Sequence, residues 1–400
     1  MLYIKNAQIL TPSQVIEGGA LLVQEGKIAA LGPVEQVRCL DGAAVIDAEG
    51  MTLTPGFVDV QINGGFGLDF TADPSTIWAV AGQLPRYGVT AFLPTVITSP
   101  LDNITRAQQI VLDRPPDFRG AKPLGLHVEG PFLNPQKKGA HNPDYLRKPD
   151  IDAVRDWTPE YGVRLVTLAP ELPGALELIE TLVSRGVVVS SGHTMATYDQ
   201  AQAGFDAGTR YGTHLFNAQP PLHHREPGLI GALFTDGRPI VGMIVDGIHS
   251  HPSIVDMVWR LLGHRLSLVT DAMEAMGMPP GTYKLGDLQV IVDETSARLA
   301  DGTLAGSILT LDAALRNLMC FTGCSFQDAL PAVTTVPATL LDLDSHCGQL
   351  APGCAADLVL LDGEYRVVKT IIDGKIVYDR VTDPNMSPLK KLNAKSQGFD

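Results

Sequence analysis

The sequence predicts an α/β protein, a (β/α)8 TIM-like barrel with a small β-sandwich domain formed by the N- and C-terminal segments. Two observations lead to this prediction. In the middle of the chain, short apolar runs typical of buried parallel strands alternate with helix-like stretches. At both ends, short strand-like runs are separated by glycine turns. The length of 400 residues fits one barrel of roughly 250–300 residues and a smaller second domain.

The small domain is expected to combine residues 1–54 with residues 348–382. Glu25-Gly26, Asp362-Gly363 and Asp373-Gly374 mark turns between short strands. Because neither segment is long enough to form a good core alone, the economical arrangement brings both ends together, with the barrel inserted between them. The expected strands are Leu2–Leu10, Ala20–Gln24, Lys27–Leu31, Ala44–Asp47, Asp357–Leu361, Arg366–Ile372 and Lys375–Tyr378.

Residues 55–347 are expected to form the barrel. Eight strand candidates alternate here with helix-like stretches, which favours a closed parallel barrel over an open sheet. The stretches Pro74–Tyr87, Pro173–Ser184 and Pro252–Leu262 each begin with a proline, which the first turn of a helix tolerates. The strand candidates are Phe57–Gln61, Val89–Leu93, Leu124–Val128, Arg164–Leu168, Val187–Ser190, Arg210–Thr213, Ile240–Val245 and Leu266–Thr270.

An insertion at residues 273–306 follows the last strand. It contains a Pro-Pro-Gly turn at Pro279–Gly281 and strand-like runs at Tyr283–Leu285 and Leu288–Val292. Its position after a strand end places it above the face where the carboxyl ends of the barrel strands meet. We therefore expect it to act as a lid or flap.

Composition and charge exclude several functions. The net charge of −14 argues against non-specific nucleic-acid binding, which needs a basic surface. No apolar stretch approaches the ~18 residues needed to span a membrane, and the N-terminus lacks the pattern of a signal peptide. The five cysteines, an odd number, are interpreted as reduced thiols. We expect a cytoplasmic protein that binds neither nucleic acid nor membrane, with a disordered polar tail at residues 383–400.

Metal-binding side chains follow three of the predicted strands. Glu129, His193 and His214 each come directly after an apolar run, and in a (β/α)8 barrel the carboxyl ends of the strands converge on one active site. Two histidines and a glutamate form a catalytic zinc set with one position left open for water. Taken singly, each could be a structural residue, salt-bridged or hydrogen-bonded in the core. Together they predict a mononuclear metallohydrolase.

Asp271 follows the last strand and is the candidate general base. An aspartate beside a metal-activated water can take its proton and later pass it to a leaving amine, although an N-cap role would also explain its position. The first strand ends in Gln61-Ile62-Asn63, where a second metal would usually be held by His-x-His. Because Gln61 and Asn63 are poor zinc ligands, we expect one metal. Zinc is favoured by the ligand set, with iron, manganese or cobalt as alternatives.

Loops after the strands supply candidate substrate contacts. Arg225 lies in a loop bounded by Pro and Gly, and arginine binds phosphate bidentately. An ion pair with Glu226 or another acid on the surface would also explain this arginine. His141 and His249 are loop histidines over the same face, and Asp246 ends the seventh apolar run.

The motifs of the chain occur in a specific order. They are Pro55–Gly64, Gly125–Phe132, Gly192-His193, Thr213–Ala218, Arg225–Gly228, Asp246–His249, Thr270–Ala272 and Leu304–Ser307, closed by Ala356–Leu360 in the small domain. This ordered set resembles the amidohydrolase superfamily and, within it, the N-acetylglucosamine-6-phosphate deacetylase family. The resemblance covers the chain nearly end to end. Any one of these motifs alone would be weak, but the ordered set is highly specific.

The resemblance implies a role for each candidate residue. Glu129, His193 and His214 would bind one divalent metal ion, preferably Zn²⁺, and Asp271 would be the catalytic acid/base. Arg225 would bind the sugar phosphate, reaching in from a neighbouring subunit of a homodimer or higher homo-oligomer. The other substrate contacts would be Ala140 and His141 at the sugar or its acetamido carbonyl, Asn217, Ala218, Asp246 and His249 at the phosphate, and Leu304, Ala305 and Gly306 from the flap.

The resemblance also implies the reaction. It is the hydrolytic deacetylation of N-acetyl-D-glucosamine 6-phosphate to D-glucosamine 6-phosphate and acetate in amino-sugar catabolism. One alternative is an amidohydrolase acting on another N-acyl amino-sugar phosphate, such as the galactosamine epimer, because sequence alone cannot separate epimers. The remote alternative is a non-catalytic barrel, against which the intact metal-binding and acid/base residues argue.

Overall fold

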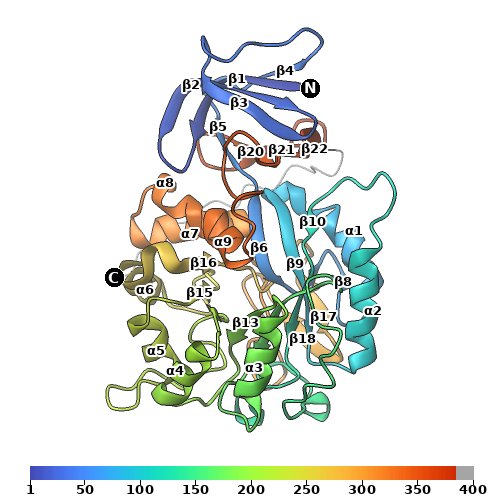
Figure 1. Ribbon diagram of the computed structural model, residues 1–400, viewed down its shortest axis with the longest axis vertical. Helices are drawn as coiled ribbons and strands as arrows, with labels where there is room; N and C mark the ends of the chain where they lie inside the picture. The colour runs from blue at the N-terminus through green and yellow to red at the C-terminus, as the bar shows by residue number, and fades with distance from the viewer. Residues whose placement is uncertain (384–400) are drawn as a thin grey trace.

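The computed structural model describes residues 1–383 as a barrel with a smaller β domain at one end (Figure 1). In the small domain, strands from the N-terminal and C-terminal segments lie side by side, and the chain between them forms the barrel. The predicted fold class is confirmed. Residues 384–400, nearly all of the tail expected to be disordered, lie outside the described residues.

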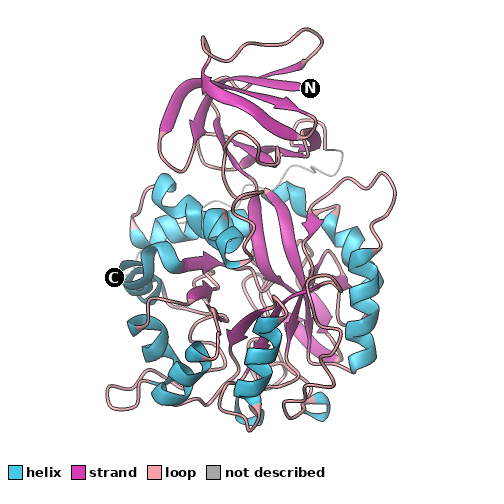
Figure 2. Ribbon diagram, in the orientation of Figure 1, coloured by secondary structure: helices cyan, strands magenta, loops and turns pink. Residues whose placement is uncertain are grey.

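Both chain ends contribute strands to one sheet of the small domain (Figure 2). β5 (Thr52–Pro55) joins them, since it pairs in parallel with β1 (Leu2–Leu10) and antiparallel with β20 (Leu358–Leu361). Alternate side chains of β1 pack into two apolar clusters, Ile4 into one and Tyr3 into the other. The other strands are β2 (Val15–Gln24), β3 (Lys27–Pro33), β4 (Ala44–Asp47), β21 (Val367–Ile372) and β22 (Lys375–Asp379).

The wall of the barrel is a nine-stranded sheet in which the short β10 (Lys122–Pro123) accompanies strands at the eight predicted positions. The wall closes where Ile62 bridges Ala272, next to a 2.8 Å hydrogen bond from the Asp271 N–H to the Gln61 carbonyl. The eight strands are β6 (Phe57–Ile62), β9 (Val89–Ile97), β11 (Leu126–Glu129), β12 (Val163–Leu168), β13 (Val188–Ser191), β14 (Tyr211–Gly212), β15 (Ile240–Met243) and β16 (Leu266–Leu268).

Helices cover the outside of this wall (Figures 1 and 2). α6 (Pro252–Leu262) forms where it is predicted, and the His251 side chain caps it by accepting a hydrogen bond from the Ser253 N–H. The other helices are α2 (Leu101–Leu112), α3 (Ala175–Ser184), α4 (Tyr198–Asp206), α5 (Gly228–Thr235), α7 (Leu311–Thr322), α8 (Phe326–Ala329) and α9 (Thr335–Leu340).

The helix expected at Pro74–Tyr87 is interrupted. It consists of a 3-10 turn at its start, α1 (Ile77–Ala81), and a second 3-10 turn, η2 (Leu84–Tyr87), after Gly82. Pro85 has no N–H to donate, and its ring would clash with the carbonyl of the preceding helical turn. One continuous helix therefore cannot form, and the chain turns twice to reach β9.

The insertion after β16 forms a three-stranded sheet. Its strands are β17 (Gly281–Leu285), β18 (Leu288–Val292) and β19 (Ala297–Arg298). The sheet packs its apolar side chains with Ile97, at the carboxyl end of β9, and with Ala140, in the loop after β11. The insertion thus lies over the carboxyl ends of the barrel strands.

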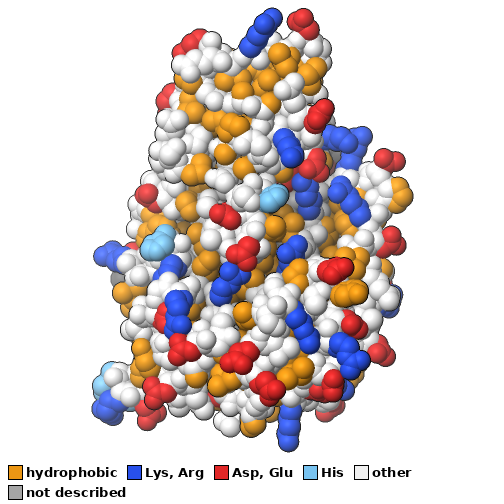
Figure 3. Space-filling model, viewed as in Figure 1, with side chains coloured by type: hydrophobic (Ala, Val, Ile, Leu, Met, Phe, Trp, Pro, Cys, Tyr) orange, Lys and Arg blue, Asp and Glu red, His pale blue; other side chains and the backbone are white. Residues whose placement is uncertain are grey.

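The helices and the charged surface can be compared with the prediction that the protein binds neither membrane nor nucleic acid. None of the helices within residues 1–383 is both long and apolar enough to cross a membrane. On the face drawn in Figure 3, acidic and basic side chains are interspersed over the barrel. On that face, the mixture of charges differs from the clustered basic surface that binds nucleic acid, and the net charge of −14 is of the opposite sign.

Candidate active site

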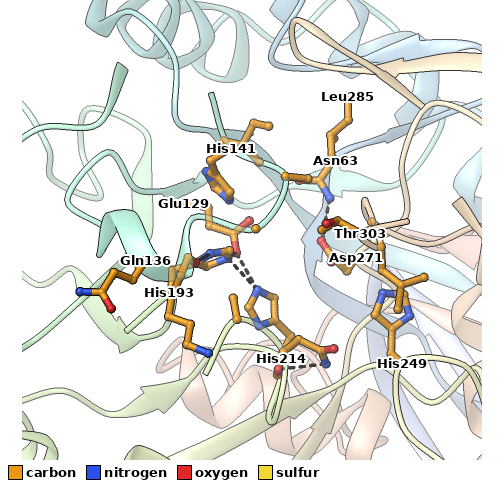
Figure 4. A pocket seen from close by; sticks show the side chains of 18 residues that line it. Asn63, Glu129, Gln136, His141, His193, His214, His249, Asp271, Leu285 and Thr303 are labelled. Atoms are coloured by element: carbon orange, nitrogen blue, oxygen red, sulfur yellow. Dashed lines mark hydrogen bonds and ion pairs between the residues drawn. The ribbon is translucent and has the colours of Figure 1, made fainter. Parts of the chain in front are cut away.

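Four side chains predicted from the sequence meet at the carboxyl ends of the barrel strands (Figure 4). Glu129 is the last residue of β11, and His193, His214 and Asp271 closely follow β13, β14 and β16. All four are buried, with exposed fractions between 2% and 9%. Charged and titratable groups are rarely buried together unless they bind a metal or one another.

Glu129, His193 and His214 point their ligand atoms at one another. Oε1 of Glu129 lies 3.2 Å from Nε2 of His193 and 3.0 Å from Nε2 of His214. The two Nε2 atoms lie 3.1 Å apart. Ligand atoms ~2.0–2.1 Å from a tetrahedral ion are separated by about 3.3 Å, so this triangle fits three protein ligands of one metal ion.

The loop after β11 orients His193. Its Nδ1 donates a 2.8 Å hydrogen bond to the Lys137 carbonyl, which leaves Nε2 as the ring nitrogen that faces the cluster. Such a second hydrogen bond is typical of metal-binding histidines. Gly139 lets the loop pass close to the ring, because its φ is +54° and a Cβ there would lie 3.2 Å from Cε1 of His193.

Glu129 is held in its ionised form. Burial acts to raise the pKa of its carboxyl, but hydrogen bonds and charges from His193 and His214 hold that pKa well below its ordinary value. Nε2 of Gln61 donates a further hydrogen bond, 3.1 Å long, to Oε1. The ionised carboxylate is the form that binds a metal ion.

Three of the four side chains project from left-handed backbone. The φ angles are +50° at His193, +28° at His214 and +46° at Asp271. Residues with a Cβ rarely adopt such angles, which persist only where the surrounding structure determines them. At Asp271 that structure includes the barrel closure, where its N–H donates to the carbonyl of Gln61. Backbone strain of this kind collects at active sites.

The Asp271 carboxylate is positioned by two amide side chains. Nδ2 of Asn63 donates a 2.7 Å hydrogen bond to Oδ1 of Asp271, and Nε2 of Gln61 lies 3.3 Å from the same oxygen. Burial, together with the negative charge of Glu129, raises the pKa of Asp271 to about 6. A carboxyl group with such a pKa can both accept and return a proton near neutral pH.

These residues line a cavity of about 340 Å³, a size suited to a small molecule. Figure 4 shows Asn63 beside Asp271, and His141 near Glu129 and His193. Most of the predicted substrate contacts also line the cavity, namely Ala140, His141, Asn217, Ala218, His249, Leu304 and Gly306.

His141 is neutral and offers one donor. Burial, with the charge of His193, lowers the pKa of His141 to about 3. Its Nδ1 accepts a hydrogen bond from the Thr98 N–H at 3.3 Å, so the proton of the neutral ring lies on Nε2. His141 can therefore donate to an oxygen in the cavity.

His249 is held by Asp246. Nδ1 of His249 lies 2.6 Å from Oδ2 of Asp246, whose Oδ1 accepts the N–H groups of Ile248 and His249 at 2.8 Å each. Burial acts to raise the pKa of Asp246, but the hydrogen bond and charge of His249 lower it below its ordinary value. Asp246 thus acts on the cavity through His249, which it fixes in place.

Three predicted substrate contacts are not among the residues that line the cavity. Asp246 lies behind His249, and Ala305 is buried within the flap, where its N–H donates to the Ala297 carbonyl. Arg225 lies in an exposed loop, and its Nη1 is 2.8 Å from Nε2 of the neighbouring His224. The described chain by itself therefore does not bring Arg225 into its own cavity.

The cavity also contains residues that sequence reasoning missed. They are Ile97, Gln136, Lys137, Gly139, Leu285 and Thr303, and Asn63, for which the sequence indicates only that it is a poor metal ligand. Lys137 is half-buried, and its Nζ donates to the Gln219 carbonyl at 3.1 Å. The adjacent lysines at 137 and 138, between Glu129 and His141, were the available signal for this loop.

Comparisons with known proteins agree with this geometry. The model of the amidohydrolase family matches residues 52–377. N-acetylglucosamine-6-phosphate deacetylase of Bos taurus is 40% identical over 391 residues, covering 92% of this chain and 95% of the relative. N-acetylgalactosamine-6-phosphate deacetylase of Escherichia coli O157:H7 is 36% identical over 377 residues, covering 93% of this chain and 98% of the relative.

Solved structures resemble the whole chain. The crystal structure of N-acetylglucosamine-6-phosphate deacetylase from Pasteurella multocida superposes with a TM-score of 0.88 at 31% identity, covering 94% of this chain and 99% of that one. A mutant of the Mycobacterium smegmatis deacetylase, in complex with N-acetyl-D-glucosamine-6-phosphate, superposes with a TM-score of 0.86 at 35% identity and the same coverage. The chain belongs to the amidohydrolase family and, within it, to the N-acetylglucosamine-6-phosphate deacetylases.

Proposed function

We propose that this protein hydrolyses the acetamide of N-acetyl-D-glucosamine 6-phosphate, giving D-glucosamine 6-phosphate and acetate, in amino-sugar catabolism. The observation that carries this function is a cluster of Glu129, His193 and His214 that shares one cavity with a separate carboxylate, Asp271. The names of the relatives and of the similar structures support the choice of substrate.

The side chains of the cavity account for the proton transfers. When bound at the cluster, a divalent cation supplies Lewis acidity that activates water and polarises the amide carbonyl. Ionised Asp271 removes a proton from the attacking water and returns it to the amide nitrogen, so that the C–N bond breaks with a neutral amine as leaving group. His141 donates from Nε2 to the oxyanion that develops on the carbonyl oxygen.

We propose that the metal is a single zinc ion per subunit, held by Glu129, His193 and His214. Three nitrogen and oxygen ligands with one open position are typical of catalytic zinc. Gln61 and Asn63 support a single ion, because both direct amide N–H groups toward Asp271. Metal analysis of protein purified without chelators tests this, with one zinc per chain as the expected result and two ions per chain as the contrary one.

We propose that His249 binds the phosphate group of the substrate, with Asn217 and Ala218 beside it in the cavity. His249→Ala is expected to raise KM for the phosphorylated sugar about 10- to 100-fold, the range of a hydrogen bond to a charged group, and to leave kcat within about threefold. KM for unphosphorylated N-acetylglucosamine should not change. His264→Ala, in the 3-10 turn after α6, is the control, and an equal effect on both sugars would contradict the phosphate contact.

We propose that Arg225 enters the cavity of a second subunit in a homodimer. Its exposure and its absence from the residues that line its own cavity support this arrangement. Arg225→Ala and Asp271→Asn chains, each with little activity, are expected to regain activity when co-expressed. In mixed dimers, an Arg225→Ala subunit keeps Asp271 and receives the arginine of its partner, so about a quarter of all sites should be complete. Activity no higher than the two parents would mean that Arg225 acts within its own subunit.

We further propose a division into domains. Residues 1–54 and 348–382 form one unit, residues 55–347 form the barrel inserted between them, and residues 273–306 act as a flap. The flap is supported by Leu285, Thr303, Leu304 and Gly306, which line the cavity.

A cytoplasmic location is supported by the five cysteines, all of which are free thiols.

Acetate release tests the proposed function directly. Metal-replete protein is given N-acetylglucosamine 6-phosphate, N-acetylgalactosamine 6-phosphate and unphosphorylated N-acetylglucosamine. The highest kcat/KM is expected for the first. A preference for the galactosamine epimer would move the assignment to the activity named for the Escherichia coli relative, and no release from any of the three would reject deacetylation.

A further inference from the structure

We propose that Asn63 and Gln61 form an amide clamp that aims the carboxylate of Asp271, so that only one of its oxygens takes part in proton transfer. This inference rests on the acid/base role of Asp271 in the proposed function. Neither residue is a metal ligand in this proposal. Both are positioning residues, acting on the reaction through Asp271.

Asn63 is fixed from three directions. Its N–H donates to the Ala272 carbonyl at 2.7 Å, and its carbonyl accepts the Phe70 N–H at 3.0 Å. Its side chain is buried, and Nδ2 donates to Oδ1 of Asp271 at 2.7 Å. Because the backbone on both sides of the side chain is bound, the amide presents a fixed donor to the carboxylate (Figure 4).

Gln61 holds Asp271 through both main chain and side chain. Its carbonyl accepts the Asp271 N–H at 2.8 Å, and its Nε2 lies 3.3 Å from Oδ1 of Asp271. The same Nε2 donates to Oε1 of Glu129 at 3.1 Å. One fully buried amide group thus lies between two carboxylates whose charges repel each other, and it gives a donor to each.

The side-chain oxygens of Asn63 and Gln61 indicate what determines the orientation of the two amide groups. Oδ1 of Asn63 and Oε1 of Gln61 are buried and have no hydrogen-bond partner among the described residues. Rotating either amide by half a turn would place its oxygen against a carboxylate oxygen, which is repulsive. A buried acceptor without a partner is costly, and most buried polar groups avoid that state. Both amides nevertheless leave their oxygens without a partner and direct their N–H groups at Asp271. This orientation indicates that the two side chains hold the carboxylate in place.

The clamp has a chemical consequence. Oδ1 of Asp271 receives both donors, whereas Oδ2 makes no hydrogen bond to a described residue. Oδ2 is therefore the oxygen left to take the proton of the attacking water and return it to the amine. Because rates depend steeply on the alignment of reacting groups, the clamp acts on kcat more than on binding of the sugar.

Two variants of Asn63 separate donation from packing. Asn63→Ala removes the donor and leaves space, whereas Asn63→Asp keeps the shape and replaces the donor with an acceptor. If Asn63 donates to Asp271, both variants should lower kcat about 10- to 100-fold, with KM for N-acetylglucosamine 6-phosphate within about twofold. If Asn63 only fills space, Asn63→Asp should retain nearly full activity, which would overturn the clamp. Metal content per chain should remain that of the parent in both variants.

Asn103→Ala is the matched control, because Nδ2 of Asn103 donates to the Thr71 carbonyl at 3.4 Å, outside the cavity. Its kcat is expected to stay within about twofold of the parent. An assay of the parent protein tests the deacetylase activity separately from the clamp. Crystal structures of the parent and Asn63→Ala decide the clamp independently of activity: a rotated Asp271 side chain is expected in the variant, and an unchanged one would overturn the proposal.

Discussion

Asp271→Asn is expected to lower kcat for acetate release by about 10²- to 10⁴-fold, the range contributed by general acid–base catalysis. Among the described residues that line the cavity, only Glu129 and Asp271 carry a carboxyl group, and Glu129 belongs to the metal cluster. Asparagine has nearly the same shape as aspartate but cannot take up the proton of the attacking water. Steady-state kinetics should show the loss in kcat, with KM and metal content close to those of the parent.

The pH dependence gives a second check on Asp271. Burial, together with the charge of Glu129, raises its pKa to about 6. The base must be ionised, so kcat/KM of the parent should fall as pH drops through the pKa of Asp271. A cation bound at the cluster favours the ionised form of Asp271, so this fall in kcat/KM should occur at or below pH 6. The residual kcat/KM of Asp271→Asn should not show this fall at low pH.

Asp206→Asn is the matched control for the aspartate substitution. Asp206 lies at the end of α4 and pairs on the surface with Arg238 at 2.9 Å, so its loss should affect neither kcat nor metal content. Retention of most turnover in Asp271→Asn would transfer the acid/base role to another group. The first candidate would then be His141, which lines the same cavity.

The sequence alone predicted that Glu129, His193 and His214 would come together, because of their positions after three strands. Glu129, His193 and His214 each come after an apolar run long enough for a buried strand. In a parallel barrel every such position points to the same face, so knowing the fold was enough to bring the three together. The observed contacts of 3.0–3.2 Å between their ligand atoms follow from that topology.

Other features of the site depend on contacts that spacing does not encode. The hydrogen bond from His193 to the Lys137 carbonyl requires the path of the long loop after β11. For Gln61 and Asn63, the sequence indicates only that they are poor zinc ligands. Their donation to Asp271 depends on the barrel closing between its first and last strands, which sets residues about 210 positions apart within hydrogen-bonding distance.

Arg225 and the first helix show two further limits of sequence reasoning. A loop flanked by Pro and Gly does not reveal whether it folds over its own cavity or projects away, and the structure places Arg225 in an exposed position. The segment Pro74–Tyr87, which begins with a proline, is predicted as one helix, but Gly82 and Pro85 divide it. A proline inside the segment ends the helix, although a proline at its start is compatible with one.

Glu129→Gln is expected to weaken metal binding by at least about 100-fold, because the change reaches a direct ligand, whereas losses of 10- to 100-fold follow from changing outer partners alone. Oε1 of Glu129 is the common neighbour of both histidine Nε2 atoms, at 3.2 Å and 3.0 Å. Glutamine keeps the shape but removes the negative charge that offsets a divalent cation. Purified Glu129→Gln should therefore contain well under one metal ion per chain, and its acetate release should fall in proportion.

Thermal unfolding separates this loss from a general defect in folding. A ligand that binds only the folded state raises Tm, so a chelator should lower the Tm of the parent and leave that of Glu129→Gln unchanged. Glu177→Gln, on the exposed face of α3, should behave as the parent in metal content and in its response to chelator.

Full metal occupancy in Glu129→Gln would remove Glu129 from the ligand set. The two histidines would then need a different third partner, and the nearest carboxylate in the cavity is Asp271. In that event Asp271→Asn would lose its metal along with its turnover, an outcome opposite to the one expected from an acid/base role.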